Sequence, residues 1–419
     1  MVDERKVPEG YKVTEVGVIP EDWDVQSLGT NSTLKARIGW QGLTTAEYLT
    51  DGEYYLITGT DFINGRIDWD NCYYVEKQRY EQDRNIQVRK KDILVTKDGT
   101  IGKVAFIDQI MIGATLNSGV FAIRPLKSTY EPEYLYHILM SRVFRDFLDR
   151  LAAGSTISHL YQKDFVHFEF PIPSITEQKA MAEALSDTDN LIQSYEKLIN
   201  KKKKIKQGAM QQLLTGKKRL PGFSGDWEIK KLGEIARMQS GGTPRTEVKQ
   251  FYSGNIPWAS INDMTASRKY LRYTEKKITQ EGLDKSSAVV FPEDTILYAM
   301  YASIGECVIT KKEVSSSQAI LGIQCYDQIL CVEYLYYYLS FIKCFMRTQG
   351  QTGTQSNLNK NMVQNINITL PSIEEQKAIA QVLSDMDAEI EALEEKLKKV
   401  KTIKQGMMQE LLTGRIRLI

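Results

Sequence analysis

The chain has 419 residues, of which 42% are hydrophobic and 26% charged, and its 54 basic against 53 acidic residues give a formal net charge of +1. This length favours two or three domains, and the composition excludes a largely disordered chain. The balanced charge excludes a small, uniformly basic nucleic-acid-binding module, but it leaves room for basic faces locally.

Cysteine spacing and hydropathy indicate the compartment. The five cysteines lack CxxC spacing, which favours reduced thiols over a zinc site or a disulfide framework. No apolar run approaches the roughly 18 residues that a membrane-spanning helix needs. We therefore expect a soluble, cytoplasmic protein with no membrane partner.

Along the chain, the pattern before residue 172 is mixed. Residues 91–107 predict a strand, a glycine turn and a second strand, and residues 133–152 predict an amphipathic helix. The same two patterns recur at residues 292–310 and 332–347. We predict the α+β class, with one mixed fold used twice. The aromatic residues of the later helix are expected in the core or at an interface rather than in base stacking.

The most extensive repeat joins residues 172–220 to residues 370–418. At a constant offset of 198, 28 of the 49 aligned positions are identical, with no gap. Shared words include PSI.EQKA, LSD.D and IKQG.MQ.LLTG. A tandem duplication explains this pattern, since solenoid proteins repeat at shorter periods. Each half then holds one variable block and one well-preserved block.

The preserved blocks predict two long helices of about 38 residues each. Ser174 and Ser372 are candidate N-caps, with Glu177 and Glu375 at capping-box spacing. Gly216 and Gly414 are candidate stops.

Apolar residues within both predicted helices recur at steps of four and three, the pattern of a coiled-coil seam. The predicted seam residues are Leu185, Ile192, Tyr195, Ile199, Leu383, Met386, Ile390, Leu393 and Leu397. We expect the two copies to pair as an antiparallel coiled coil with approximate two-fold symmetry. The alternative is an ordinary packed surface.

The order of variable block, helix, variable block, helix resembles the DNA-specificity (S) subunit of Type I restriction-modification systems. The words that carry this resemblance are IPEDW, GGTPRT, IPWASIND, SIGECVI, LPSIEEQKAIA and IKQGMMQELLTG, and it covers essentially the whole chain. It implies target-recognition domains at residues 1–172 and 217–370, and conserved spacer helices at residues 173–216 and 371–419.

In that family, each recognition domain reads one half of a bipartite site in double-stranded DNA. The paired helices set the spacing and dock two methyltransferase (modification) subunits. Restriction subunits, which translocate and cut DNA, join the larger complex. The resemblance thus implies a sequence-specific, non-catalytic DNA-recognition subunit.

Residues suited to DNA contact lie in glycine-rich or polar loops and at the lysine-rich end of the first helix. Lysine and arginine suit phosphates or guanine, and asparagine and glutamine suit adenine. The candidates are Lys97, Thr100, Lys103, Thr243, Arg245, Gln355, Asn357, Lys201 and Lys203. Turn chemistry is the plain alternative for the loops. A solvated helix face is the alternative for the lysines, favoured by the unequal charge of the two copies.

Catalytic motifs are missing from the sequence. It contains no adenine-methyltransferase motif, no Walker A loop and no zinc spacing. Asp263 with Glu275, Lys276 and Lys277 gives a D…ExK arrangement that could hold a metal, but ExK also occurs within the predicted helices. We expect no catalytic centre, no metal and no cofactor. The alternatives are a coiled-coil adaptor without its own DNA specificity and a metal-dependent nuclease.

Overall fold

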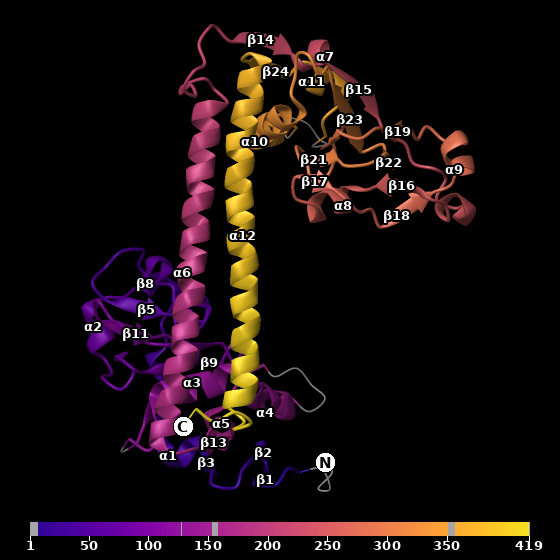
Figure 1. Ribbon diagram of the computed structural model, residues 1–419. Helices are drawn as coiled ribbons and strands as arrows, with labels where there is room; N and C mark the ends of the chain where they lie inside the picture. Colours follow the sequence, from indigo (N-terminus) through magenta and orange to yellow (C-terminus); the bar gives the residue numbers. More distant parts are fainter. Residues whose placement is uncertain (1–6, 127, 153–157, 351–356, 419) are drawn as a thin grey trace. The chain divides into compact units, whose positions relative to one another are not determined.

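The computed structural model describes residues 7–126, 128–152, 158–350 and 357–418. These residues form two compact units, Met1–Glu196 with Lys396–Ile419 (unit 1) and Lys197–Glu395 (unit 2). Each unit contains one globular block and part of each of two long helices, α6 (Ile175–Leu213) and α12 (Ile373–Leu411) (Figure 1). Both helices have 39 residues, in agreement with the predicted length.

The block of unit 1 is built on two sheets. The larger is antiparallel and ordered β10-β9-β12-β4, with β4 (Ser32–Ala36), β9 (Ile93–Thr96), β10 (Val104–Phe106) and β12 (Val120–Pro125). The smaller is ordered β11-β5-β8, with β5 (Tyr55–Ile57), β8 (Tyr73–Tyr74) and β11 (Ala114–Leu116). Three two-stranded pairings complete it: β3 (Asp24–Ser27) with β13 (Glu169–Ile172), β1 (Tyr11–Thr14) with β2 (Gly17–Pro20), and β6 (Phe62–Ile63) with β7 (Arg66–Ile67).

Unit 2 repeats this plan with its own strands. Its larger sheet is ordered β15-β23-β20-β21-β17, with β15 (Ala236–Ser240), β17 (Tyr270–Leu271), β20 (Ile296–Ala299), β21 (Cys307–Thr310) and β23 (Ile320–Cys325). The other is ordered β18-β16-β22-β19, with β16 (Ile256–Ala259), β18 (Lys276–Ile278), β19 (Val290–Phe291) and β22 (Val314–Ser316). β14 (Glu228–Lys231) pairs with β24 (Asn367–Leu370).

The two blocks therefore share a topology. Four strands of each larger sheet follow the same order, β10-β9-β12-β4 matching β21-β20-β23-β15. In each smaller sheet one parallel pair recurs, β5 with β11 and β16 with β22. This confirms that one mixed fold is used twice. Both predicted hairpins are present as well, in β9–β10 and β20–β21.

Short helices connect the strands. They are α1 (Leu28–Asn31), α2 (Lys77–Glu81), α5 (Gln162–Phe165), α7 (Leu232–Ile235), α8 (Ile261–Ala266), α9 (Gln280–Asp284) and α11 (Lys360–Gln364). Single 3-10 turns are η2 (Gly39–Gln41), η3 (Thr45–Glu47), η4 (Trp69–Asn71) and η5 (Lys249–Tyr252). No helix among the described residues combines the length and the apolar composition needed to cross a bilayer.

The helix predicted at residues 133–152 is divided in the structure. It forms α3 (Pro132–Met140) and α4 (Arg142–Ala152), and Ser141 between them has an extended backbone. The Ser141 hydroxyl donates to the Ile138 carbonyl at 2.6 Å and accepts from the Val143 amide at 3.2 Å. This side chain satisfies backbone groups that the helix would otherwise bond. The counterpart α10 (Val332–Gly350) is continuous.

The ends of the long helices follow the predicted caps. The Ser174 hydroxyl accepts from the Glu177 amide at 3.2 Å, and Ser372 caps Glu375 in the same way at 3.3 Å. Gly216 and Gly414 have φ values of +69° and +70°, which glycine adopts without a Cβ penalty. These contacts explain why both helices start and stop at equivalent residues.

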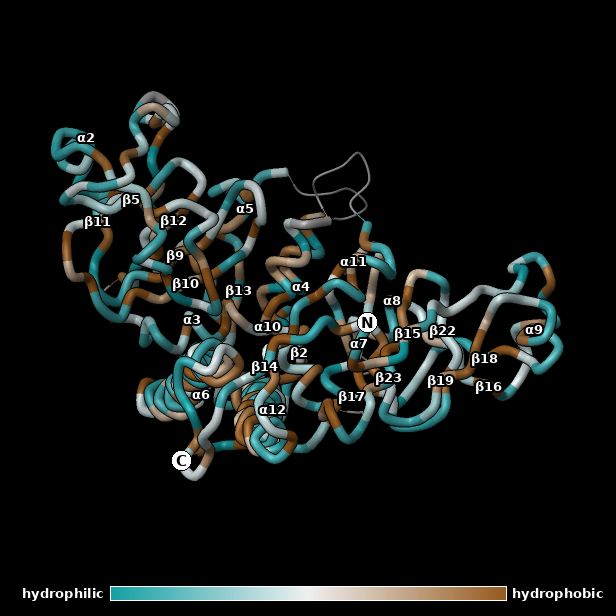
Figure 2. The backbone as a smooth tube through the Cα atoms, turned by 90° about the horizontal axis from the view of Figure 1, so that it is seen from above, coloured by the Kyte–Doolittle hydropathy of each residue, from teal (hydrophilic) through white to brown (hydrophobic). Residues whose placement is uncertain are grey.

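Both helices contribute to the core of each unit. In unit 1, Met181 and Leu185 of α6 pack in the same cluster as Leu411 and Leu412. In unit 2, Ile379 and Leu383 of α12 join Leu213 and Leu214. Figure 2 shows that α6 and α12 each carry apolar and hydrophilic segments, as expected for helices with one face against a core.

Ion pairs show the direction in which the helices pair. In unit 1, Asp189 pairs with Lys404 at 2.5 Å, and Glu196, further along α6, pairs with the earlier Lys401 of α12 at 2.7 Å. Partners that run in opposite senses require antiparallel helices. Unit 2 repeats the pattern, with Asp387–Lys206 at 2.5 Å and Glu394–Lys203 at 2.7 Å. The predicted antiparallel pairing is thus present within each unit.

Candidate functional site

The candidate residues of unit 1 lie on the turn between β9 and β10. The Lys97 side chain is half-buried, and its ammonium lies 5.5 Å from the centroid of the Phe121 ring. Thr100 is exposed at the tip of the turn. The Lys103 ammonium donates to the Gly59 carbonyl at 3.2 Å and so stabilises the turn itself. Of the three, Thr100 is the most available to a ligand.

A second loop of unit 1 meets this turn. The segment that follows α4 returns through His159, which forms a β-bridge to Asp98. The Asp98 carboxylate accepts a hydrogen bond from Nδ1 of His159, and the Leu160 amide donates to the Lys97 carbonyl at 2.9 Å. The sequence does not reveal this contact, because 61 residues separate Asp98 from His159.

The candidates of unit 2 occupy two segments. Thr243 and Arg245 follow β15, where the Thr243 hydroxyl donates to the Gln318 side chain and Arg245 is exposed. Asn357 is half-buried and precedes α11. Gln355 lies outside the described residues. No hydrogen bond that the structure describes joins Arg245 to Asn357 directly.

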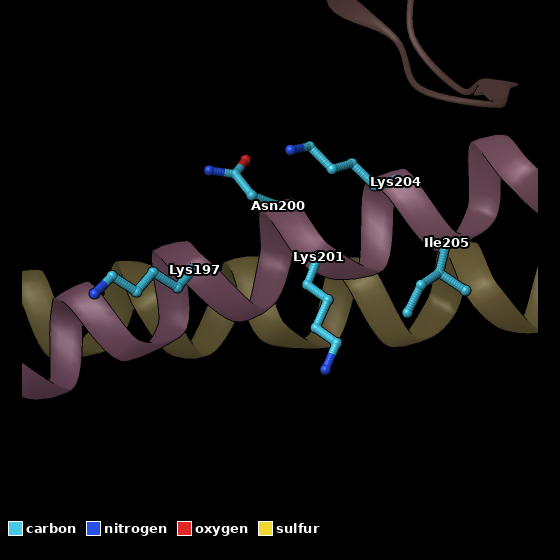
Figure 3. A pocket seen from close by; sticks show the side chains of 5 residues that line it. All are labelled: Lys197, Asn200, Lys201, Lys204 and Ile205. Atoms are coloured by element: carbon cyan, nitrogen blue, oxygen red, sulfur yellow. The ribbon is translucent and has the colours of Figure 1, made fainter. Parts of the chain in front are cut away.

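The lysine-rich end of α6 divides into two faces. Lys202, Lys203 and Lys206 pair with acidic residues of α12 in the same unit, at 2.6, 2.7 and 2.5 Å. Lys197, Lys201 and Lys204 instead line a shallow concave surface with Asn200 and Ile205 (Figure 3). Lys203 is therefore part of the helix pairing, whereas Lys201 remains exposed to a ligand.

The predicted seam residues all lie away from full solvent exposure. Leu185, Ile192, Ile199, Leu383 and Ile390 are buried, with at most 9% of their surface exposed. Tyr195, Met386, Leu393 and Leu397 are half-buried. Leu185 and Leu383 are fully buried in the cores of their units, which gives the most deeply packed positions of the seam a second role in holding each block.

Arg219, which follows α6, and Arg417, which follows α12, each bind a glutamate in the first turn of the other long helix. We call these two contacts the arginine latches. The Arg417 guanidinium donates to both carboxylate oxygens of Glu177 and to Asp22, where the hydrogen bonds measure 3.1 and 3.0 Å. Arg219 donates to both oxygens of Glu375 at 2.6 Å. Each guanidinium also lies over a tryptophan ring, at 5.6 Å for Arg417 and 5.4 Å for Arg219.

In a capping box, the glutamate carboxylate would accept a hydrogen bond from the N-cap backbone amide. Here the carboxylates of Glu177 and Glu375 bind the arginines. The guanidinium of Arg417 holds the pKa of Asp22 below its usual range through a hydrogen bond. Sequence reasoning missed the latches, although Arg219 and Arg417 are themselves one of the identities at offset 198.

The D…ExK arrangement has a structural role. Asp263 Oδ2 accepts from the amide and hydroxyl of Ser260 at 2.8 and 2.7 Å, and Oδ1 accepts from the Glu275 amide at 2.9 Å. Its carboxylate thus caps α8 and ties down a loop. Within the described ranges, no group of three or more histidine, cysteine, aspartate or glutamate side chains is placed to hold a metal ion.

Comparison with known proteins agrees with this architecture. The family described as "Type I restriction modification DNA specificity domain" matches residues 20–207 and 224–402, one copy for each half of the chain. The putative type I restriction enzyme MjaX specificity subunit of Methanocaldococcus jannaschii is 28% identical, over 98% of this chain and 97% of its own length. The MjaVIII specificity subunit of the same organism is 26% identical, over 96% and 94%.

Solved structures share the fold. The S subunit of a type I restriction-modification system from M. genitalium has a TM-score of 0.61 at 17% identity, covering 93% of this chain and 96% of that one. A chain from a study of type I R-M complex assembly and conformational transition has a TM-score of 0.56 at 18% identity, with coverage of 95% and 99%. The two-fold repetition of one mixed block and one helix defines the class, and the chain belongs to the type I restriction-modification DNA specificity family.

Proposed function

We propose that this chain is the sequence-specific DNA-recognition subunit of a type I restriction-modification complex. The observation that carries the proposal is the repetition of one topology in two blocks, each attached to the same helical contacts. Two readers of one fold suit a bipartite site in double-stranded DNA, with one half for each block. Residues 1–172 and 217–370 would be the recognition domains, and residues 173–216 and 371–419 the spacer helices.

The long helices would set the distance between the half-sites. A helix of 39 residues spans roughly 58 Å at 1.5 Å per residue. Continuous helices suit a fixed spacer, and the repeated contacts at offset 198 suit a pseudo-two-fold arrangement.

Two methyltransferase subunits would dock on surfaces that the repeat preserves. Several identical residues are exposed in both copies and so are not kept by the core. The pairs within the preserved IKQG.MQ word are Ile205 with Ile403, Gln207 with Gln405 and Gln211 with Gln409. Exposed isoleucines, 47% and 58% accessible, have no packing reason to persist twice.

The paired helix glycines strengthen this argument. Gly208 and Gly406 lie inside helices, where glycine costs about 1 kcal/mol relative to alanine. A Cβ added at either position would meet nothing within 4 Å, so packing within the described chain does not require glycine. Close approach of a partner to the helix backbone would require it. Because the surface occurs twice, the partner would bind twice.

The remaining parts of the proposal follow the family. Restriction subunits would join the complex, the chain itself would carry no catalytic centre, and it would act in the cytoplasm, where host DNA lies. Lys201 would contact a phosphate, which adds affinity without sequence information. Thr100, Arg245 and Asn357 remain candidates for contact with DNA.

The test is co-expression with the methyltransferase subunit of its own system, followed by modification-sensitive sequencing of the host DNA. We expect a motif of two short specific halves around a fixed gap. Replacing residues 23–171 with the corresponding block of a relative should change one half only. A stable complex that leaves DNA unmodified and shows no salt-sensitive duplex binding would instead favour a coiled-coil adaptor.

A further inference from the structure

The hairpin turns of the two units share a backbone frame. In unit 1 it is held by four hydrogen bonds: Thr96 N to Lys103 O, Gly102 N to Thr96 O, Lys97 N to Gly119 O and Leu160 N to Lys97 O, at 2.8–2.9 Å. Unit 2 repeats all four: Ala299 N to Glu306 O, Gly305 N to Ala299 O, Met300 N to Ala319 O and Leu358 N to Met300 O, at 2.8–3.1 Å. We call these sets the hairpin frames.

Buried anchors fix both frames in the same way. Leu160 and Leu358, on the returning loops, are each 1% exposed. Gly102 and Gly305 have φ values of +78° and +81° at the same point of the turn. Because backbone and anchors agree, residues at equivalent positions of the two frames project from equivalent points.

Of four equivalent outward positions in the two frames, three differ in side-chain chemistry and one keeps a hydroxyl in both. Equivalent positions hold Asp98 and Tyr301, Thr100 and Ser303, His159 and Asn357, and Tyr161 and Asn359. Each of these residues is exposed or half-buried. A constant backbone that carries different hydrogen-bonding side chains is what two readers of different sequences require.

Three side chains of unit 1 are held in place before any ligand binds. The Asp98 carboxylate accepts from Nδ1 of His159, whose ring lies 4.5 Å from the Tyr161 ring between centroids. An ionised carboxylate can only accept, so Nδ1 carries the hydrogen, and when the ring is neutral its Nε2 is an acceptor. The His159 side chain is 27% exposed and Tyr161 is 53% exposed.

We infer that the hairpin frames carry the specificity-determining side chains of the two half-sites, an inference that rests on the proposed function. Nε2 of His159 accepts a hydrogen bond from the exocyclic amine of an adenine or a cytosine in the major groove. Asp98 is the positioning residue that fixes the ring. In unit 2, Asn357 takes the equivalent position and offers an amide, which pairs with adenine.

The plain alternative to a function in base recognition is neutral sequence drift of these exposed residues. It explains different side chains, but it does not explain a carboxylate–imidazole pair that joins two loops 61 residues apart. A half-exposed pair of this kind adds little stability. A function in orienting the imidazole accounts for it directly.

The experiment uses the complex with the methyltransferase subunits and modification-sensitive sequencing of host DNA. We expect His159→Ala and Asp98→Ala to relax one half-site, with a roughly tenfold loss of discrimination at the affected position, and to leave the other half unchanged. Asp98→Asn should retain the parental motif, because its amide oxygen still accepts from Nδ1. Asn357→Ala is the matched variant and should relax only the other half.

Three outcomes separate the inference from the proposed function. A parental complex that yields no bipartite motif overturns the proposed function. A parental motif that persists in full in both His159→Ala and Asn357→Ala overturns the hairpin inference alone. If a variant complex modifies no DNA, its affinity for the cognate duplex and for singly substituted duplexes tests the hairpin inference instead. Equal losses of affinity for all duplexes overturn the inference, and a loss of affinity confined to the cognate duplex supports it.

Discussion

At the scale of single residues, the two arginine latches compensate the two buried glutamates at the starts of the long helices. Glu177 and Glu375 have side chains only 1% exposed, so each carboxylate depends on its arginine for compensation. A buried charge that loses its partner is costly, whereas removal of both partners often costs little. The latches hold residues beyond the helix ends against the first turn of the other helix.

We expect Arg417→Ala to lower the free energy of unfolding by about 2–3 kcal/mol, somewhat less than for a fully buried pair because the arginine is partly exposed. Arg219→Ala should destabilise unit 2 in the same direction. Urea denaturation measures both. Glu177→Gln in the Arg417→Ala background should recover part of the loss, and a loss below about 0.5 kcal/mol in the single variant would contradict the latch.

A second residue-scale feature is the buried histidine of α3. Burial lowers the pKa of His137 to about 3, and its Nε2 lies 3.1 Å from the Ser186 hydroxyl. Unfolding restores the ordinary pKa of about 6.5, so the unfolded chain binds the proton that the folded chain excludes. The contribution of neutral His137 is complete above pH 6.5 and is lost progressively as the pH falls towards 3.

Unit 2 supplies the matched residue. Tyr337 stands at the equivalent position and donates to Asp387 Oδ2 at 2.8 Å, whereas the equivalent Oδ2 of Asp189 is buried without a partner among the described residues.

We therefore expect His137→Tyr to reduce the acid sensitivity of unfolding, by up to about 1.4 kcal/mol per pH unit between pH 6.5 and 3. His137→Phe should do the same without satisfying Asp189 and so be less stable at pH 7. Denaturation across this pH range is the measurement, and an unchanged slope in both variants would rule out His137 as the source.

At the scale of elements, the sequence patterns predicted those helices and hairpins that are determined by interactions between residues close in sequence. The long helices, their serine caps and the two hairpins follow from periodicity and turn residues in single stretches of sequence. The break at Ser141 depends on one hydroxyl and has no periodic signal. The Asp98–His159 pair and the arginine latches join residues 61, 156 and 240 positions apart, so only the tertiary fold reveals them.

The helix glycines give a prediction at the same scale. We expect Gly208→Ala to raise the stability of the free chain by about 1 kcal/mol and yet to weaken binding of the methyltransferase subunit. Thermal unfolding and a titration of the partner measure the two effects. Ser194→Ala is the control, since Ser194 is exposed and the other helix already has Ala392 there. Unimpaired assembly in both Gly208→Ala and Gly406→Ala would remove the glycine argument.

At the scale of the whole molecule, the net charge of +1 means that DNA affinity depends on local faces rather than on overall attraction. We expect Lys201→Ala to reduce the slope of log affinity against log salt by about 1, with no change in sequence preference. Lys203→Ala is the comparison, because Lys203 is already paired with Glu394. Equal slopes for Lys201→Ala and the parent complex would show that Lys201 does not contact a phosphate.

The two units differ in the order in which their residues are synthesised. Unit 2 is one uninterrupted segment, Lys197–Glu395, while unit 1 joins the start of the chain to Lys396–Ile419. The first block is therefore synthesised first but completed last, since its core includes Leu411 and Leu412. A chain truncated before Lys396 keeps every residue of unit 2 but leaves apolar surface uncovered in unit 1, which makes it a substrate for chaperones and proteases.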